Sequence, residues 1–253
     1  MDYHTQSLVR DHDASCRMTD FIQFYTHYDE EGRLKRHRTE FVATTYVLDQ
    51  LILAGARVLE VGAATGAYSI HFATRGCSVV ALDAMARHID TLRAKLQSLP
   101  HLEVQALVED ARDLSAFAAH DFDAVLCMGP VYHVSDLDAK VCLDGCIAAL
   151  KPEGLLAVSY VNTFQGYERH KYVEEFVHRT PTEIEALLAS YDLDRICHVP
   201  TDGVVFGELN VITQEESGRL AKLHEWLDQN QGVFKNEIWP DTSIHGLYVG
   251  RKS

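Results

Sequence analysis

The sequence lacks several features that would assign a protein to a class at once. It has no run of about 18 apolar residues, although 47% of its 253 residues are hydrophobic, so we expect no transmembrane helix. The first residues, Met1-Asp2-Tyr3-His4, are not a basic region followed by an apolar stretch, so we expect no secretory signal. The six cysteines are scattered, and Cys77 and Cys127 lie in or beside strand patterns. This pattern predicts buried, reduced thiols and a cytoplasmic location.

Positive charge and clustered metal ligands are also scarce. The chain has 23 Lys and Arg against 37 Asp and Glu, a formal net charge of −14. A protein that binds nucleic acid needs clustered basic residues, and the only such cluster, residues 33–38, follows the acids at 29–31, so the charges there nearly balance. Cys142 and Cys146 share a helix face but have no further ligands nearby in the sequence, so we expect no metal site. The balance favours a small neutral or cationic substrate, with no nucleic-acid or membrane partner.

The most informative segment is residues 58–68, VLEVGAATGAY. An apolar run contains Glu60 and leads into a loop of small residues, which allow a tight turn and a close approach of the backbone to a ligand. About twenty residues later, a second apolar run ends in Asp83. An acid at the end of the next strand can accept hydrogen bonds from ribose hydroxyls. Dinucleotide-binding enzymes share this device, so the pair alone does not choose the cofactor.

Three later segments narrow the choice: EDARDL at 109–114, FDAVLCMGP at 122–130 and LKPEGLLAV at 150–158. With the first two, and in this order, they resemble the motifs of class I S-adenosylmethionine (SAM) dependent methyltransferases. The resemblance covers roughly residues 55 to 162, and its main departure is Ala64, where the family usually has glycine. An NAD-binding Rossmann domain fits less well, because the loop is not G-x-G-x-x-G and the Lys151-Pro152 turn would be unexplained.

The resemblance implies where SAM would bind. Asp83 would accept hydrogen bonds from the ribose, Asp110 would accept from the adenine amino group, and the Ala111 amide would donate to a ring nitrogen. The other cofactor positions that it implies are Glu60, Gly62, Ala63, Ala64, Gly66, Ala84, Met128 and Tyr28.

The alternation of strand and helix patterns predicts an α/β fold. The resemblance makes this a Rossmann-like, seven-stranded, mostly parallel sheet with helices on both faces, in which residues 244–250 form an antiparallel strand beside the fifth. We divide the chain into an N-terminal helical cap, the SAM-binding catalytic domain and, within that domain, a lid insertion after strand five, at residues 1–50, 51–253 and 163–200. The later elements that we expect are helices at 136–150, 167–178 and 215–231, a helix that begins at Pro181 behind Thr180, and a strand within 196–206.

The loop after the fourth strand, residues 128–134, resembles the GPLYHL segment of a subset of small bacterial methyltransferases. Histidine titrates near neutral pH, which makes His133 a candidate general base. The alternative is that His133 caps the following helix or bonds a backbone carbonyl. Tyr132 would hydrogen-bond the substrate or face the SAM methyl group, or else pack against the lid.

Four residues are candidate substrate contacts. Tyr25 lies on an aromatic helix stripe with Tyr28, which is either a core-facing seam or a set of rings that attracts the sulfonium cation. Arg33 would pair with the SAM carboxylate or an acidic substrate, or form an ordinary surface ion pair. Tyr160 and Asn162 end the fifth strand, where either can bind substrate or serve the structure alone.

Several functions stay open within one cofactor fold. The leading prediction is a small-molecule O- or N-methyltransferase, for which a homodimer is one possible assembly. The second is an enzyme that consumes SAM without methyl transfer, for example by closing a ring and releasing methylthioadenosine. An RNA or protein methyltransferase is disfavoured by the charge and by the absence of an N-P-P-[YF] loop at residues 128–131. A non-catalytic SAM-binding regulator is the remaining alternative.

Overall fold

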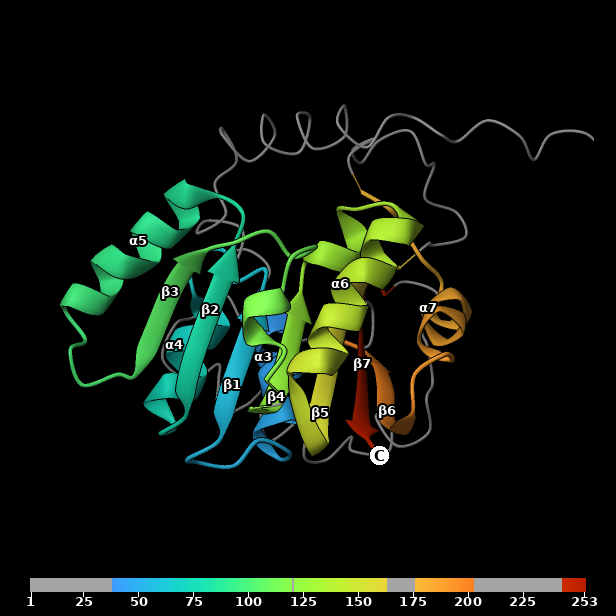
Figure 1. Ribbon diagram of the computed structural model, residues 1–253, viewed down its shortest axis with the longest axis horizontal. Helices are drawn as coiled ribbons and strands as arrows, with labels where there is room; N and C mark the ends of the chain where they lie inside the picture. Colours follow the sequence, from blue (N-terminus) through green and yellow to red (C-terminus); the bar gives the residue numbers. More distant parts are fainter. Residues whose placement is uncertain (1–37, 120, 163–175, 203–242) are drawn as a thin grey trace, which may run out of the picture.

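The computed structural model describes residues 38–119, 121–162, 176–202 and 243–253. Within them, seven strands form one sheet in the order β3-β2-β1-β4-β5-β7-β6 (Figure 1). Strands β1 to β5 pair in parallel, whereas β7 runs antiparallel to both of its neighbours, β5 and β6. The prediction of a Rossmann-like, mostly parallel seven-stranded sheet is confirmed, including the antiparallel strand beside the fifth.

The strands are β1 Arg57–Val61, β2 Ser78–Asp83, β3 Val104–Val108, β4 Phe122–Met128, β5 Leu150–Val161, β6 Leu193–Pro200 and β7 His245–Lys252. The helices are α3 Arg38–Asp49, α4 Ala67–Thr74, α5 Ala86–Gln97, α6 Asp136–Ala149 and α7 Pro181–Leu188, with short 3-10 turns η1 Ser115–Phe117 and η2 Pro130–Tyr132.

The core has two layers because the central strands are apolar on both faces. Leu59 of β1 packs in a cluster with residues of α6 and α7, while its neighbour Val58 packs in a second cluster with residues of α3 and α4. α5 packs on the same side as α4, where Ile89 and Leu92 lie against Ala63 of the loop after β1. The helices therefore cover both faces and leave the carboxyl ends of β1 to β5 at one edge of the sheet, at the top of Figure 1. Ligands bind at this edge in open α/β sheets.

Helices α6 and α7, which cover the same face of the sheet, both begin with polar caps. Ser135 Oγ accepts a hydrogen bond from the Asp138 amide at 3.1 Å, so Ser135 caps α6. The capping interpretation of His133 is therefore wrong. Thr180 and Glu183 form a capping box at the start of α7, which confirms the helix predicted from Pro181.

The LKPEG segment lies within β5 rather than in a turn before it. The register of β4 against β5 shifts from Phe122–Leu150 to Ala124–Leu155, so the residues between Leu150 and Leu155 bulge out of the ladder. Within this bulge Glu153 has φ +63°, in the left-handed region that favours glycine.

The expected division of the chain needs one correction. Residues 181–200 form α7 and the edge strand β6, so a lid cannot extend to residue 200. Residues 176–180 precede α7 without helical structure, which corrects the end of the helix predicted at 167–178. The rest of that helix, the helix at 215–231 and most of the predicted cap lie outside the described residues. Within the expected cap, α3 packs on the central sheet through Val47 and Leu48.

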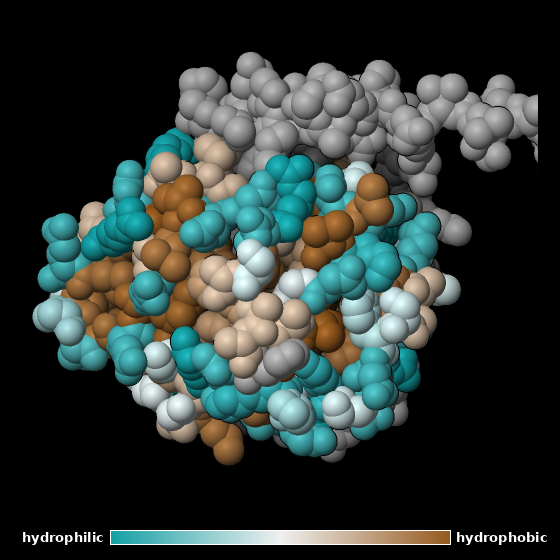
Figure 2. All heavy atoms as spheres, in the orientation of Figure 1, coloured by the Kyte–Doolittle hydropathy of each residue, from teal (hydrophilic) through white to brown (hydrophobic). Residues whose placement is uncertain are grey.

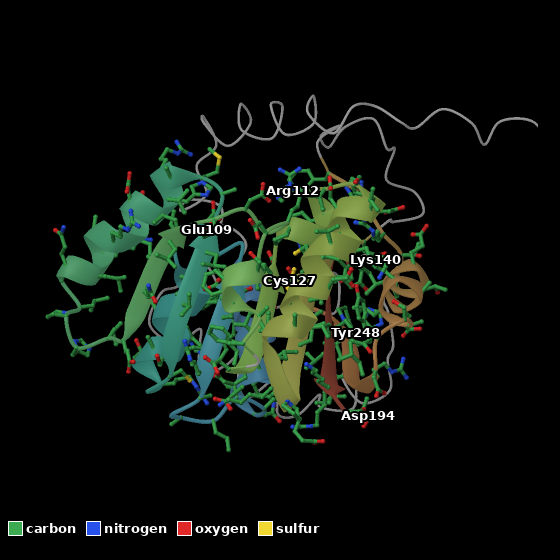
Figure 3. All side chains as sticks on the ribbon, viewed as in Figure 1. Glu109, Arg112, Cys127, Lys140, Asp194 and Tyr248 are labelled. Carbon is green, nitrogen blue, oxygen red and sulfur yellow. The ribbon has the colours of Figure 1, made fainter. Side chains whose placement is uncertain are left out.

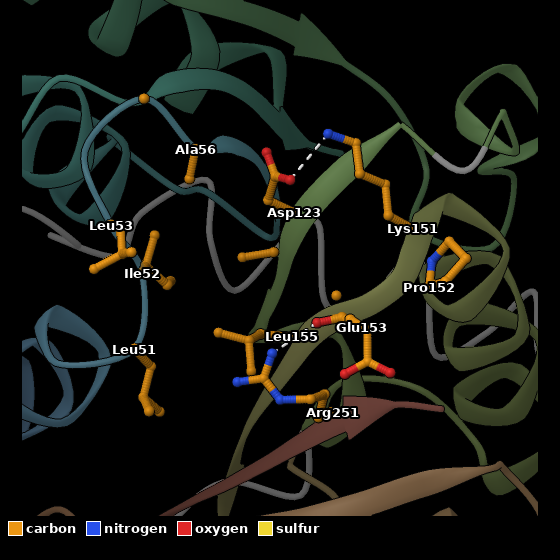
Figure 4. A pocket seen from close by; sticks show the side chains of 13 residues that line it. Leu51, Ile52, Leu53, Ala56, Asp123, Lys151, Pro152, Glu153, Leu155 and Arg251 are labelled. Carbon is orange, nitrogen blue, oxygen red and sulfur yellow. Dashed lines mark hydrogen bonds and ion pairs between the residues drawn. The ribbon is translucent and has the colours of Figure 1, made fainter.

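Among the described residues, a hollow lies away from the carboxyl edge of the sheet. A cavity of about 410 Å³ lies at the opposite edge, between the start of β4 and the bulge of β5 (Figure 4). In its wall, Asp123 and Lys151 form an ion pair of 2.9 Å, and Arg251 donates a hydrogen bond to the Glu153 carbonyl. Hydrophobic residues gather on the left of the face shown in Figure 2, over β2 and β3, and hydrophilic residues predominate over the rest of it. The homodimer stays a prediction. Among the helices of the described ranges, none has the length and hydropathy that a membrane span requires.

Candidate active site

The loop between β1 and α4 is fixed by close backbone packing. Gly62 has φ +84°, and a Cβ atom there would lie 2.7 Å from the Met128 carbonyl oxygen and 2.7 Å from Pro130 Cδ. The loops after β1 and β4 therefore touch directly, which requires glycine. Ala64 also has a positive φ, +47°, so the residue that replaces the family's glycine keeps a conformation that favours glycine.

Glu60 lies under this loop rather than in it. Its side chain is 1% exposed and accepts a hydrogen bond from the Ser69 hydroxyl of α4. Burial, aided by the charge of Asp83, raises the pKa of the Glu60 carboxyl to about 8, although the Ser69 bond acts in the opposite direction. The structure thus places Glu60 where it ties β1 to α4, and its predicted contact with the cofactor stays a prediction.

Asp83 ends β2 and contacts the loop between β1 and α4. One carboxylate oxygen accepts from the Ala64 amide and the other from the Met85 amide, both at 2.8 Å, and His88 Nδ1 lies 3.2 Å from the second oxygen. Each carboxylate oxygen can accept more than one hydrogen bond, so ribose hydroxyls can still bind. The side chain is 11% exposed. Ala84, the next residue, is exposed at the same edge.

Asp110 follows β3 at the same edge and pairs with Arg112. The guanidinium donates to both carboxylate oxygens, with its shortest contact, from Nη2, at 2.6 Å, and the Arg112 amide donates at 2.9 Å. These bonds hold the pKa of Asp110 below its usual value although burial acts to raise it. Glu109 and Arg112 lie at the upper edge of the sheet in Figure 3, whereas Asp194 lies at the lower edge. Ala111 is half-buried between the two partners. An adenine amino group would therefore share the carboxylate with Arg112.

The loop after β4 brings together three rings. The ring of His133 lies 4.5 Å from that of Tyr132 and 4.9 Å from that of Phe176, measured between centroids. A Cβ atom on Gly129 would be 3.7 Å from the Tyr132 hydroxyl and 3.9 Å from the Gly62 carbonyl oxygen. The hydroxyl therefore lies beside the loop between β1 and α4, which we call the cofactor loop. The environment of His133 is aromatic, and its role as a base stays a prediction. Met128, which ends β4, buries its side chain in the core.

The two candidates at the end of β5 differ. Tyr160 is 1% exposed and its hydroxyl lies 2.8 Å from His198 Nε2, in the cluster beneath α6 and α7, so we withdraw it as a substrate contact. Successive residues of a strand point to opposite faces, so Tyr160 lies on the same face as Val158, in this core cluster. Asn162 donates to the Ser243 carbonyl at 3.1 Å, and within the described part of the chain its buried Oδ1 has no hydrogen-bond partner. Asn162 thus remains a candidate. Tyr25, Tyr28 and Arg33 lie outside the described residues.

Sequence reasoning missed two polar groups at this edge. Arg179 is 5% exposed and donates to the Val131 carbonyl and, at 2.6 Å, to Asp136, which anchors the loop after β4. His245 Nδ1 lies 2.5 Å from Asp202 Oδ2, across 43 residues of sequence. No local motif marks either group, because each depends on segments that only the folded sheet brings together.

Comparison with known proteins identifies the kind of domain to which these strands and loops belong. A family model described as a methyltransferase domain matches residues 58–154. These residues run from β1 and its loop to the bulge of β5. The chain carries a class I SAM-dependent methyltransferase domain. The predicted family and the predicted cofactor, SAM, are thereby confirmed.

The relatives of this methyltransferase domain include enzymes named for O-methylation. The chain is 37% identical over 137 residues to a ubiquinone biosynthesis O-methyltransferase of Xanthomonas axonopodis pv. citri, covering 53% of this chain and 56% of that protein. A corresponding protein of Xylella fastidiosa is 36% identical over 137 residues, 53% of this chain and 54% of that protein. The chain thus matches little more than half the length of these relatives.

Solved structures confirm the fold across most of the chain. Magnesium protoporphyrin IX methyltransferase from Synechocystis PCC 6803, solved with bound S-adenosylhomocysteine (SAH), aligns with a TM-score of 0.65 and 11% identity over 94% of this chain and 100% of that chain. A Burkholderia thailandensis 1,6-didemethyltoxoflavin-N1-methyltransferase aligns with a TM-score of 0.64 and 18% identity over 98% and 93%. These identities are low, so the likeness concerns the fold.

Proposed function

We propose that this chain transfers the methyl group of SAM to an oxygen or nitrogen atom of a small molecule. One observation carries the proposal: the loop after β1 and the acids Asp83 and Asp110 lie together at the carboxyl edge of the sheet, with Asp83 already held by the Ala64 amide. The domain match supports SAM as the cofactor, and the names of the relatives support oxygen as the acceptor.

The residues at the edge fit the parts of SAM. Asp83 would bind the ribose hydroxyls, Asp110 would bind the adenine amino group, and the turn at Gly62 would let the backbone approach the amino acid part. SAM supplies an electrophilic methyl group, and the transfer chiefly needs proximity and orientation of the acceptor. Tyr132, whose hydroxyl lies beside this loop, and Asn162, with its buried carbonyl oxygen, are the proposed contacts for the acceptor.

The by-product tests the proposal. The full chain is incubated with SAM and a panel of small acceptors (catechol, 4-hydroxybenzoate, tyramine), and the products are separated by liquid chromatography and mass spectrometry. We expect SAH together with an acceptor that gains one methyl group. Methylthioadenosine instead would indicate that SAM is consumed without methyl transfer. SAM binding without any product would point to a regulator.

A further inference from the structure

A histidine and two acids meet at the carboxyl edge, on the side of the sheet that α3 covers. His245 is the first residue of β7 and pairs with Val161, the last residue of β5. Because β7 is antiparallel to β5, its first residue lies where the parallel strands end. Leu247 and Val249, two and four residues later, pack in the cluster that contains α3 and α4, so the His245 side chain points to that same side.

Asp202 fixes the orientation of this histidine. Its Oδ2 lies 2.5 Å from His245 Nδ1, while its Oδ1 accepts from the Ser243 hydroxyl at 3.0 Å and from the amides of Ile244 and His245 at 2.8 and 3.0 Å. Burial acts to raise the pKa of Asp202, but the hydrogen bonds and charge of His245 and the two amide bonds outweigh it, so the pKa lies below its usual value. An ionised carboxylate only accepts hydrogen bonds, so the neutral ring carries its hydrogen on Nδ1. Its Nε2 is then the atom that can take a proton.

Glu40, in the first turn of α3, places a second carboxylate beside the ring. Its Oε2 lies 3.9 Å from His245 Nε2, too far for a direct hydrogen bond but close enough to stabilise the ring once it is protonated. The side chains of Glu40, Asp202 and His245 are 11%, 17% and 18% exposed. The group is neither sealed in the core nor open on the surface, as a base that meets a bound substrate must be.

A second histidine–carboxylate pair provides a contrast. His198 Nδ1 lies 3.0 Å from Glu185, but its Nε2 is bonded to the Tyr160 hydroxyl and its side chain is only 2% exposed. This buried pair links β5, β6 and α7 and cannot reach a substrate, whereas the His245 side chain is 18% exposed. The His245 pair has the same chemistry at the edge where ligands bind.

We propose that His245 is the general base for the methyl acceptor and that Asp202 is its positioning residue. This inference rests on the proposed function. The acceptor's O–H or N–H bond breaks as its proton moves to His245 Nε2, the acceptor's lone pair bonds the methyl carbon, and the S–CH₃ electron pair stays on sulfur. Met128 of β4 pairs with Ser159, and His245 pairs with Val161 on the same strand, so two strand spacings, roughly 10 Å, separate the β4 loop from the histidine. The acceptor atom that loses its proton is also the atom that takes the methyl group, so it would lie between the β4 loop and His245 Nε2, within hydrogen-bond reach of the ring.

The tautomer of His245 tests the inference without any turnover. Nuclear magnetic resonance of the full chain with ¹⁵N-labelled histidine, recorded with SAH present, reports which ring nitrogen carries a hydrogen, and the His245→Gln spectrum assigns the signal. We expect a neutral ring with hydrogen on Nδ1 near pH 8, and a changed tautomer balance in Asp202→Asn. A ring that stays doubly protonated up to pH 9, or a hydrogen on Nε2 of the neutral ring, would overturn the proposal.

Kinetics with the acceptor panel give the second arm. His245→Gln should lower kcat by about 10²- to 10⁴-fold and remove the lower limb of the pH profile, with SAM affinity by calorimetry changed less than about threefold. His133→Gln is the competing variant, the same substitution at the other candidate base of this edge. A normal kcat in His245→Gln with a large loss in His133→Gln would reverse the assignment. A wild-type chain that methylates no acceptor would count against the proposed function, while the tautomer would still decide the role of His245.

Discussion

Replacing Glu60 by glutamine should change how the stability of the protein depends on pH. The Glu60 side chain is 1% exposed, and burial raises its pKa from 4.5 to about 8. Between these values the folded state holds a proton that the unfolded state releases. Stability from this group is therefore fully present below about pH 4.5 and is lost as the pH rises toward 8. Glutamine fills nearly the same volume, keeps a hydrogen-bond partner for Ser69 and does not titrate.

The size of the effect follows from the shift. Each pH unit within the window costs the wild type about 1.4 kcal/mol relative to a group that does not titrate. Between pH 5.5 and 7.5, the free energy of unfolding of Glu60→Gln should therefore gain about 3 kcal/mol on that of the wild type. All other titrating groups are shared by the two proteins, so the difference between the two curves isolates Glu60.

Urea denaturation at half-unit pH steps measures this difference. Ser69→Ala is the control, because it removes the hydroxyl but leaves the carboxyl to titrate, so its curve should keep the downward slope of the wild type. Parallel curves for the wild type and Glu60→Gln would refute the reasoning, since they would mean that Glu60 ionises alike in the folded and unfolded states.

Three further changes test the cofactor loop and its surroundings. Asp83→Ala should weaken SAM binding by about 10- to 100-fold in titration calorimetry, because a partly buried hydrogen-bonded carboxylate contributes about 1.5–3 kcal/mol; unchanged affinity would remove Asp83 from the ribose site. Ala64→Gly should raise the free energy of unfolding by up to about 1 kcal/mol by relieving the positive φ, and a clear loss in urea would contradict the strain. Arg179→Met should cost about 1–3 kcal/mol by leaving the buried Val131 carbonyl unpaired, whereas stability equal to the wild type in thermal melts would show that the bond is dispensable.

The cofactor half of the site could be predicted because each of its parts is local. Asp83 ends β2, Asp110 follows β3 by two residues, and the glycine loop follows β1 directly. In a parallel sheet these strand ends meet at one edge, so a residue's place after its strand also gives its place in the site. The same reasoning could not show that the Arg112 guanidinium already binds the Asp110 carboxylate, or that Glu60 lies beneath the glycine loop, because both depend on side-chain packing.

The face on which a side chain lies is harder to predict than the edge. Tyr160 and Val161 are neighbours at the end of β5, yet Tyr160 points beneath α7 while Val161 pairs with His245, whose side chain points toward α3. Successive residues of a strand alternate between faces, so a shift of one residue separates a core hydroxyl from a substrate contact. The sequence placed Tyr160 at the correct edge of the sheet, but it did not show that the Tyr160 side chain points into the core beneath α6 and α7.

The antiparallel strand explains why the histidine pair was missed. For β1 to β5 the predicted site residues at the carboxyl edge come at the end of the strand or in the loop after it. β7 runs the other way, so its first residue, His245, reaches the same edge, and the residue that orients it, Asp202, follows β6 some 43 positions earlier. Once residues 244–250 are predicted to be antiparallel, the segment that precedes them belongs with the ends of the parallel strands. A polar residue at the start of such a strand is therefore as good a candidate for the active site as a polar residue at the end of a neighbouring parallel strand.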